Sequence, residues 1–79
     1  MNNKLTELLA EVFEIKVSDI KIDLTKEDID GWDSLTQMDL VTSIEKEFDV
    51  ELEMLEIVEM TSIEKIIEIL KSKGVDIGA

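Results

Sequence analysis

Apolar side chains recur at helical spacing along most of this chain, and this periodicity constrains the fold more than any other feature. In the first stretch they occupy positions i, i+3, i+4, i+7 and i+8, which share one face of an amphipathic helix. Apolar and polar residues alternate, as they would in a β-strand, only over residues 20–24. A strand there would have no second strand with which to pair. The sequence therefore predicts an all-α fold. The apolar stripes are Leu5, Leu8, Leu9, Val12 and Phe13; Leu40, Val41, Ile44 and Phe48; Leu52, Leu55 and Val58; and Ile63, Ile66, Ile67 and Leu70.

The first two helices are separated by a long segment that lacks helical periodicity. The first helix covers about residues 3–15 with Asn3 as its cap, and the second begins at Asp33 or Ser34. We expect the segment between them to be an ordered loop with a short helical turn at residues 18–19. A loop this long in a compact domain tends to carry function. The apolar residues expected to hold it against the core are Val17, Ile20, Ile22, Leu24 and Ile29.

The second half of the chain predicts two further helices of unequal length. A short third helix falls within residues 51–60. A hydroxyl followed three residues later by a carboxylate, beginning at Thr61, predicts the start of the fourth helix, and Gly74 predicts its end. We therefore expect an asymmetric four-helix bundle that forms one domain over residues 1–79. Its ordered core covers about residues 3–74 and is followed by a loose C-terminal tail.

The composition excludes several classes of function. The chain has no cysteine and no histidine, so disulfides, thiolate metal sites and the commonest general bases are absent. We therefore do not expect an enzyme with catalytic residues of its own. A formal net charge of -12 opposes nucleic-acid binding, because phosphate backbones would be repelled. No run of about 18 apolar residues could span a membrane, and we expect a cytoplasmic monomer.

A dedicated metal site is not expected either, although the acidic segment before the second helix contains a glycine. Placing Gly31 at the invariant glycine of an EF-hand loop puts Lys26 at the first ligand position and Gln37 at the twelfth. A cation and an amide at these two positions remove the charges on which such a site depends. Calcium binding of the EF-hand type is therefore rejected.

The segment Gly31–Leu35 lies where the long loop becomes the second helix. Ser34 is expected to be exposed there, close to the first backbone N–H groups of the helix, which lack intrahelical partners. Those groups would stabilise a phosphate ester on this serine without a basic side chain. The plainer interpretation is that Asp33 or Ser34 is only the helix N-cap, and the pentapeptide alone favours that interpretation.

Over residues 3–73 the sequence resembles acyl carrier proteins. The resemblance rests on Gly31, on Asp33-Ser34-Leu35, on an acidic helix that ends at Phe48, and on the order of the predicted elements. It implies that Ser34 carries 4′-phosphopantetheine, transferred from coenzyme A by a separate phosphopantetheinyl transferase, with Asp33 and Leu35 beside it. It also implies that acyl groups are held as thioesters on this arm. Such a carrier needs neither a base to activate the serine nor a thiol of its own.

The resemblance further implies a docking surface and an acyl pocket. Acids on the second helix would meet basic patches on acyl-transferring, synthase or ligase enzymes, and apolar side chains near the serine would fill small pockets there. The docking candidates are Asp33, Leu35, Met38, Asp39, Glu45, Glu47, Glu53 and Glu56. The residues expected to shelter an acyl chain between the helices are Leu40, Ile44, Val58, Ile63 and Trp32.

Four positions depart from the carriers of fatty-acid synthesis. Trp32 stands where those carriers usually have a small or different residue, Thr36 and Lys46 stand where they tend to have acids, and Thr42 replaces an apolar contact residue. These differences favour a dedicated carrier of a specialised pathway, such as polyketide synthesis, lipid modification or polysaccharide acylation. An aminoacyl or peptidyl carrier is one alternative. A small acidic interaction module without a prosthetic group is another, and modification of Ser34 would separate it from the carriers.

Overall fold

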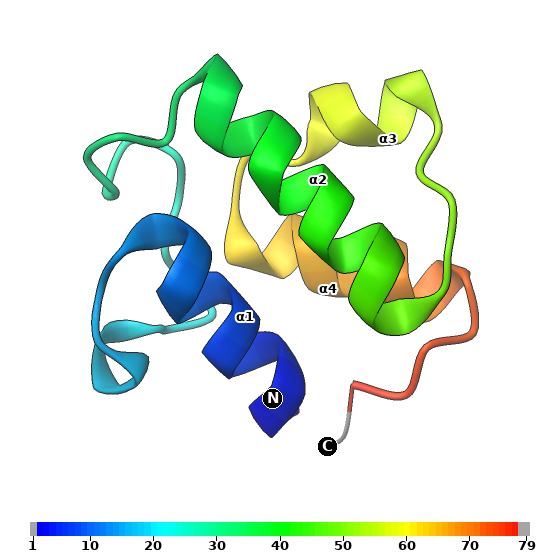
Figure 1. Cartoon of the computed structure of the whole chain (residues 1–79), viewed down its shortest axis with the longest axis horizontal. Helices are drawn as coiled ribbons and strands as arrows, with labels where there is room; N and C mark the ends of the chain where they lie inside the picture. Colours follow the sequence, from blue (N-terminus) through cyan, green and yellow to red (C-terminus); the bar gives the residue numbers. More distant parts are fainter. Residues whose placement is uncertain (1, 78–79) are drawn as a thin grey trace.

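The structure, a computed structural model, describes residues 2–77 and confirms the all-α prediction. Within these residues it contains four α-helices, one 3-10 turn and no strand. Figure 1 shows α2 running across the domain, with α1 beside it, α4 behind it and the short α3 near its N-terminal half. The elements in chain order are α1 (Asn3–Phe13), η1 (Val17–Asp19), α2 (Ser34–Phe48), α3 (Met54–Glu59) and α4 (Ile63–Ser72).

The core is built from the predicted stripes of α1, α2 and α4. Apart from Met60, the large side chains with less than 2% exposure come from these three helices, and Trp32 from the long loop is also buried. Fully burying one such side chain contributes about 1.5–3 kcal/mol to folding, so these three faces supply most of the apolar stabilisation. α3 contributes no buried residue. The largest fully buried side chains are Leu5, Leu9, Leu40, Ile44, Met60, Ile63, Ile66 and Leu70.

Side-chain caps define the helix starts and correct two predicted caps. Asn2, rather than Asn3, caps α1 by accepting hydrogen bonds from Lys4 N and Leu5 N at 2.8 and 3.1 Å. Ser62, rather than Thr61, caps α4 by accepting from Lys65 N at 3.1 Å. In both cases the cap is the residue with extended backbone immediately before the first helical turn, as capping requires.

Three helices end in the same way. The backbone N–H after each end bonds back to the carbonyl five residues earlier, from Ile15 to Ala10, from Val50 to Glu45 and from Val75 to Leu70. This pattern requires a left-handed residue at the helix end. Gly74 supplies it after α4 with φ of 85°, which confirms the predicted end, whereas Glu14 and Asp49 adopt it after α1 and α2.

The long loop between α1 and α2 is held to the core by fewer side chains than expected. Ile20 and Ile29 are buried and Leu24 is partly buried, but Val17 and Ile22 are 50% and 55% exposed. The predicted turn at residues 18–19 is present as η1. Backbone hydrogen bonds replace the missing apolar contacts by joining the loop to the start of α4, from Lys26 N to Thr61 O at 2.8 Å and from Ile63 N to Leu24 O at 3.0 Å.

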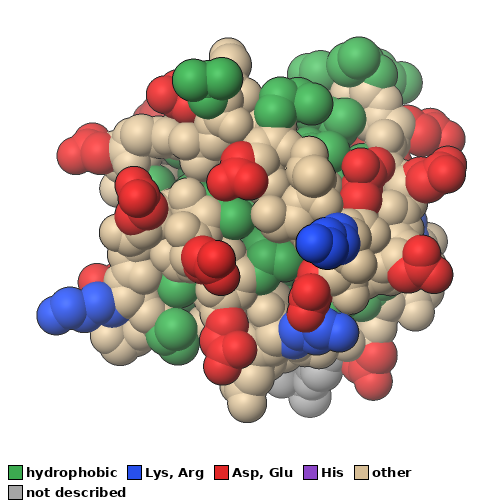
Figure 2. All heavy atoms as spheres, in the orientation of Figure 1, with side chains coloured by type: hydrophobic (Ala, Val, Ile, Leu, Met, Phe, Trp, Pro, Cys, Tyr) green, Lys and Arg blue, Asp and Glu red, His purple; other side chains and the backbone are tan. Residues whose placement is uncertain are grey.

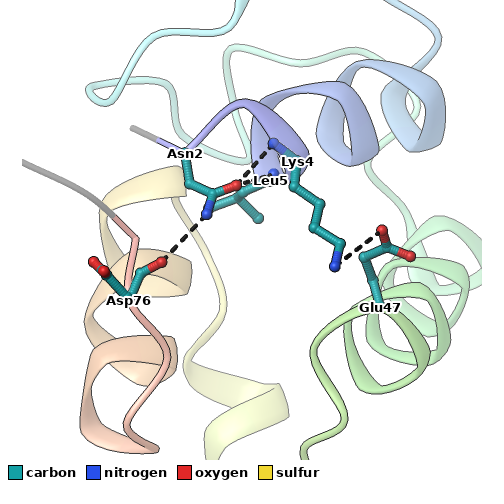
Figure 3. Close-up of polar contacts among 5 residues, drawn as sticks. All are labelled: Asn2, Lys4, Leu5, Glu47 and Asp76. Atoms are coloured by element: carbon teal, nitrogen blue, oxygen red, sulfur yellow. Dashed lines mark hydrogen bonds and ion pairs between the residues drawn. The ribbon is translucent and has the colours of Figure 1, made fainter.

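The end of the described chain is packed rather than loose. Ile77 is 2% exposed, and Asn2 Nδ2 donates a hydrogen bond to Asp76 O at 3.2 Å. Figure 3 shows this contact beside the ion pair between Lys4 and Glu47, which joins α1 to α2. The predicted loose tail is therefore wrong for residues 75–77, because the isolated apolar residue at position 77 fills part of the core. Residues 78–79 lie outside the described part of the chain.

The excess of acids predicts that the fold is stabilised by salt. The chain has 20 acidic and 8 basic residues. Among the described residues, three ion pairs involve lysines, and two of these pairs are well exposed to solvent. Raising the ionic strength shortens the Debye length from about 30 Å at 0.01 M to about 10 Å at 0.1 M, so mutual repulsion weakens. We expect Tm to rise with NaCl, and a gain of about 1 kcal/mol corresponds to about 4–8 °C in a domain of this size.

Circular dichroism melts in NaCl and in MgCl₂ at matched ionic strength would test this prediction. A larger rise in Mg²⁺ would reflect association of the divalent ion with neighbouring carboxylates. A Tm that stays constant in both salts would contradict the prediction.

Candidate functional site

Ser34 lies on the exposed surface as the first residue of α2. The Asp33 carboxylate caps the helix by accepting a hydrogen bond from Thr36 N at 2.9 Å. This backbone N–H holds the pKa of the Asp33 carboxyl below its ordinary value. Gly31, with φ of 83°, provides the turn before the cap. Because Asp33 is the cap, the Ser34 hydroxyl is left available for chemistry in the positive field of the helix N-terminus.

A pocket of about 340 Å³ opens beside Ser34 between α2 and α3. Its walls combine four apolar residues with four polar ones, which are Lys26, Ser34, Gln37 and Thr61. An anionic ester on Ser34 would therefore have both a cation and a helix N-terminus nearby, and an apolar segment attached to it would have a matching surface. The lining residues are Lys26 of the loop, Ser34, Gln37 and Met38 of α2, Ile57 and Val58 of α3, and Met60 and Thr61 after it.

Two buried residues line this pocket, Met60 and Gln37, and the sequence analysis did not identify Gln37. Its side chain is 9% exposed and lies on the core face of α2. Gln37 Oε1 accepts a hydrogen bond from the Trp32 indole N–H, and Gln37 Nε2 donates to Ile57 O at 2.8 Å and to Met60 O at 3.2 Å. Trp32 also packs against Phe13, with ring centroids 4.5 Å apart. One amide thus links the long loop, the first turn of α2 and the end of α3.

The sequence pattern around position 37 indicates that Gln37 lies on the buried face of the helix. Gln37 precedes Leu40, Val41 and Ile44 by three, four and seven residues, so it continues the apolar stripe of the helix toward its N-terminus. A glutamine on a buried stripe needs hydrogen-bond partners, because an unpaired amide in the core is costly. Those partners come from residues five, 20 and 23 positions away.

The five predicted acyl-pocket residues differ in exposure, and their role in sheltering a chain between the helices stays a prediction. Val58 is 66% exposed and lines the pocket beside Ser34. The remaining four are at most 4% exposed and belong to the packed core: Trp32, Leu40, Ile44 and Ile63. The pocket beside Ser34 is lined instead by Met38, Ile57 and Met60 together with Gln37.

The predicted apolar docking residues are at the surface, and α3 adds others that the sequence analysis did not identify. Leu35 is 82% exposed and Met38 is 54% exposed, so neither is a core residue. Met54, Leu55 and Val58 of α3 are also exposed, by 66–74%. Figure 2 shows hydrophobic side chains gathered along the edge of the domain that Figure 1 assigns to α3 and the start of α2. We call Leu35, Met38, Met54, Leu55 and Val58 the apolar rim.

The predicted docking acids fall into two groups. Asp33, Asp39, Glu47 and Glu53 are exposed, and of these Glu47 pairs with Lys4 while the Asp33 and Glu53 carboxylates cap α2 and α3. Glu45 and Glu56 are partly buried: Glu45 Oε2 accepts from Leu52 N at 2.9 Å, and Glu56 pairs with Lys73 at 2.8 Å. The partly buried Glu45 therefore helps to fix the turn between α2 and α3.

Glu56 connects the start of α3 to the end of α4, and this connection predicts a dependence on pH. Its carboxylate accepts from Glu53 N at 2.8 Å, and this N–H, followed by the Lys73 ammonium, lowers the pKa of Glu56. A folded pKa below the unfolded value gives stability that is present above the unfolded pKa and is lost as the pH falls through the folded pKa. The Tm difference between wild type and Glu56→Gln should therefore be largest above about pH 5 and shrink below about pH 4.

Thermal melts of the two proteins, recorded at intervals of about one pH unit from about pH 3 to about pH 7, would measure this difference. Glutamine can still accept from Glu53 N, so the comparison isolates the charge. Lys73→Gln removes only the ammonium, so its Tm difference from wild type should change with pH in the same direction but by less, because the hydrogen bond from Glu53 N to the Glu56 carboxylate remains. A difference that stays constant down to pH 3 would contradict a contribution from the Glu56 charge.

A larger groove, of about 500 Å³, lies between α1 and α2 away from Ser34. Its lining is mostly charged and includes Glu7, Glu11, Asp39 and Lys46. Among residues 2–77, no three acidic side chains are grouped closely enough to hold a metal ion. In the same part of the chain, none of the helices has the length and apolar character needed to cross a membrane.

These features define a small all-α domain that presents a serine at the start of its central helix, next to a pocket and an apolar rim. Residues 3–70 match the protein family described as a phosphopantetheine attachment site. No curated protein matched the chain. Because the family match covers most of the 79 residues, the chain belongs to this family and is a phosphopantetheine carrier protein. The group that defines the family is covalently attached 4′-phosphopantetheine, and its carrier domains interact with a phosphopantetheinyl transferase and partner enzymes.

Proposed function

We propose that Ser34 is the residue to which 4′-phosphopantetheine is attached. The observation that carries this proposal is the position of Ser34: it is exposed at the first residue of α2, while the neighbouring Asp33 performs the capping role. The pocket of about 340 Å³ that begins at Ser34 suits the group, because Lys26 and the helix N-terminus face an anion and Met38 and Val58 offer apolar contact. When bound, the group supplies a thiol on which an acyl cargo is held as a thioester.

The chain's own residues have the roles of presenting the serine and positioning the surface around it. Asp33 fixes the first turn of α2, and Gly31 directs the loop into that turn. The chain contains no histidine and no cysteine, so activation of the serine is assigned to the transferase rather than to a neighbouring base. In this proposal the protein is a carrier without catalysis of its own.

We propose that the partner enzymes bind across the N-terminal half of α2 and across α3. An enzyme that reaches Ser34 must cover Leu35 and Met38, and Val58 lies on the other wall of the same pocket. The exposed acids Asp33, Asp39 and Glu53 would face basic residues of the enzyme. The cargo is an acyl intermediate of a fatty-acid, polyketide or other specialised acyl pathway, and the departures at Trp32 and Thr36 favour the specialised pathways.

Intact-mass spectrometry would test the attachment. The apo protein is incubated with coenzyme A, Mg²⁺ and a broad-specificity phosphopantetheinyl transferase. We expect a single phosphopantetheine adduct per chain. Folded apo protein that acquires no adduct would contradict the proposal and would favour an interaction module that uses the apolar rim without a prosthetic group.

A further inference from the structure

We infer that the pocket between Ser34 and Val58 receives a short acyl group, and that Gln37 is the residue that limits the length of the cargo. This inference rests on the proposed attachment at Ser34. It differs from the expectation drawn from the sequence, in which a long chain is sheltered among Leu40, Ile44 and Ile63. In the structure these three side chains are at most 1% exposed, and Gln37 and Met60 are the two buried residues that line the pocket.

Gln37 uses both ends of its amide to close the space between α2 and α3. The oxygen accepts from the Trp32 indole, and the nitrogen donates to the carbonyls of Ile57 and Met60 at 2.8 and 3.2 Å. These two carbonyls belong to the end of α3 and the residue after it. A chain that continued from the pocket into the core would have to pass between Gln37 and the end of α3, and so would separate the amide from these carbonyls.

The cost of that separation is high because the groups involved are buried. Gln37 is 9% exposed, Trp32 4% and Met60 1%, so the polar atoms separated there, apart from the partly buried Ile57 carbonyl, would face apolar side chains rather than water. α3 itself has no fully buried residue: its N-terminal end is held by the ion pair between Glu56 and Lys73, and Ile57 packs partly buried against the core. The hydrogen bonds from Gln37 add to this packing at the end of α3, and opening the passage would weaken the attachment of α3 to the domain.

A short acyl group avoids this cost. It can occupy the pocket against Met38 and Val58 while the amide keeps its hydrogen bonds. The pocket is open to solvent beside Lys26 and Thr61, so a polar substituent on the cargo can also be accommodated there. A long unbranched chain would leave most of its length in water or against the apolar rim.

A length series on the otherwise unaltered protein tests the inference. The transferase loads apo protein with acetyl-, butyryl- or dodecanoyl-phosphopantetheine from the corresponding coenzyme A ester, and intact mass verifies each product. Failure to load would contradict the proposed function, whereas the inference is judged on the loaded forms. We expect the acetyl and butyryl forms to melt at or above the Tm of the unacylated form. We expect the dodecanoyl form to melt no higher than the unacylated form and to be retained much longer on a hydrophobic-interaction column.

Substitution of Gln37 by leucine tests the role of the amide. Leucine has nearly the same size but cannot bind the carbonyls of Ile57 and Met60, so a dodecanoyl chain should enter the core. The rate of hydroxylamine cleavage of that thioester should then fall roughly tenfold relative to wild type, the change expected when about two buried hydrogen bonds no longer oppose entry. Trp32→Phe is the matched control: it removes the indole hydrogen bond but keeps the amide on α3, and it should continue to exclude the chain.

Should Gln37→Leu not fold, Gln37→Asn replaces it, because the shorter amide cannot span from Trp32 to both carbonyls. A wild-type dodecanoyl form that is stabilised above the unacylated form and is as resistant to hydroxylamine as the Gln37 variant would overturn the inference. Equal protection in Trp32→Phe and Gln37→Leu would also overturn it, because the contact with α3 would then not be the determinant.

Discussion

Replacing Ser34 with alanine is expected to abolish attachment of phosphopantetheine completely while leaving the domain folded. The Ser34 side chain is exposed, none of the described hydrogen bonds depends on its hydroxyl, and Asp33 provides the cap of α2. Alanine is also the best helix former, so the first turn should be at least as stable. Intact mass after incubation with coenzyme A, Mg²⁺ and the transferase measures the loss, and a circular dichroism melt establishes that the variant is folded.

Ser43→Ala provides the matched control for this experiment. Ser43 lies on the same helix but lines the groove between α1 and α2 rather than the pocket beside Ser34. This variant should therefore acquire the adduct as completely as wild type. An adduct that persists on the Ser34 variant would place the attachment at another hydroxyl and would contradict the proposed function.

Leu40→Ala is expected to cause the largest loss of stability among substitutions on α2. Leu40 is 0% exposed and lies at the centre of the core contributed by α1, α2 and α4. Truncating a buried leucine costs about 2–5 kcal/mol through lost burial and the remaining cavity. A domain of this size has a total stability of only about 4–12 kcal/mol, so the variant should lose a large part of it. Urea denaturation should show a lower midpoint with a similar slope.

Leu35→Ala is the control, because the two leucines are five positions apart on one helix and have opposite environments. Leu35 is 82% exposed, so its truncation should change stability by less than about 0.5 kcal/mol. Its effect should appear instead in the rate of modification by the transferase, since Leu35 adjoins Ser34 on the surface that the enzyme must cover. Equal loss of stability in the two variants would contradict the assignment of Leu35 to the apolar rim.

The contrast between Leu35 and Leu40 bears on how the carrier works. A residue that meets partner enzymes has to remain exposed although it is apolar, and the five residues of the apolar rim do so next to the proposed attachment site. Such exposed apolar patches mark interaction sites in soluble proteins. Several of the predicted docking acids, by contrast, hold the fold together through Lys4, Lys73 and Leu52 N. Apolar contact is therefore expected to contribute more to docking than the density of acids in the sequence suggests.

The sequence by itself determined the all-α class, the order of the helices and most of the core. Helical periodicity is a local property, so Leu5, Leu9, Ile63 and Leu70 could be assigned to buried faces without knowing which helices would meet. The start of α2 and the end of α4 at Gly74 could also be predicted, because turns and helix caps depend on the types of only a few neighbouring residues. The loop-to-helix boundary also marked Ser34, but its nomination as the attachment residue came from the resemblance to acyl carrier proteins, because the boundary alone favoured a helix cap.

Only the tertiary structure decided what surrounds Ser34. The burial of Gln37 depends on Trp32 from the loop and on carbonyls of Ile57 and Met60, and a polar residue on a helix is ordinarily expected at the surface. The placement of α3 likewise leaves Val58 exposed, although its spacing from Leu52 and Leu55 is that of an apolar helix face. These outcomes depend on contacts between residues about 20 positions apart, whose energies compete with local preference. Local periodicity can indicate that a face is apolar, but packing between helices determines whether that face becomes core, pocket wall or docking surface.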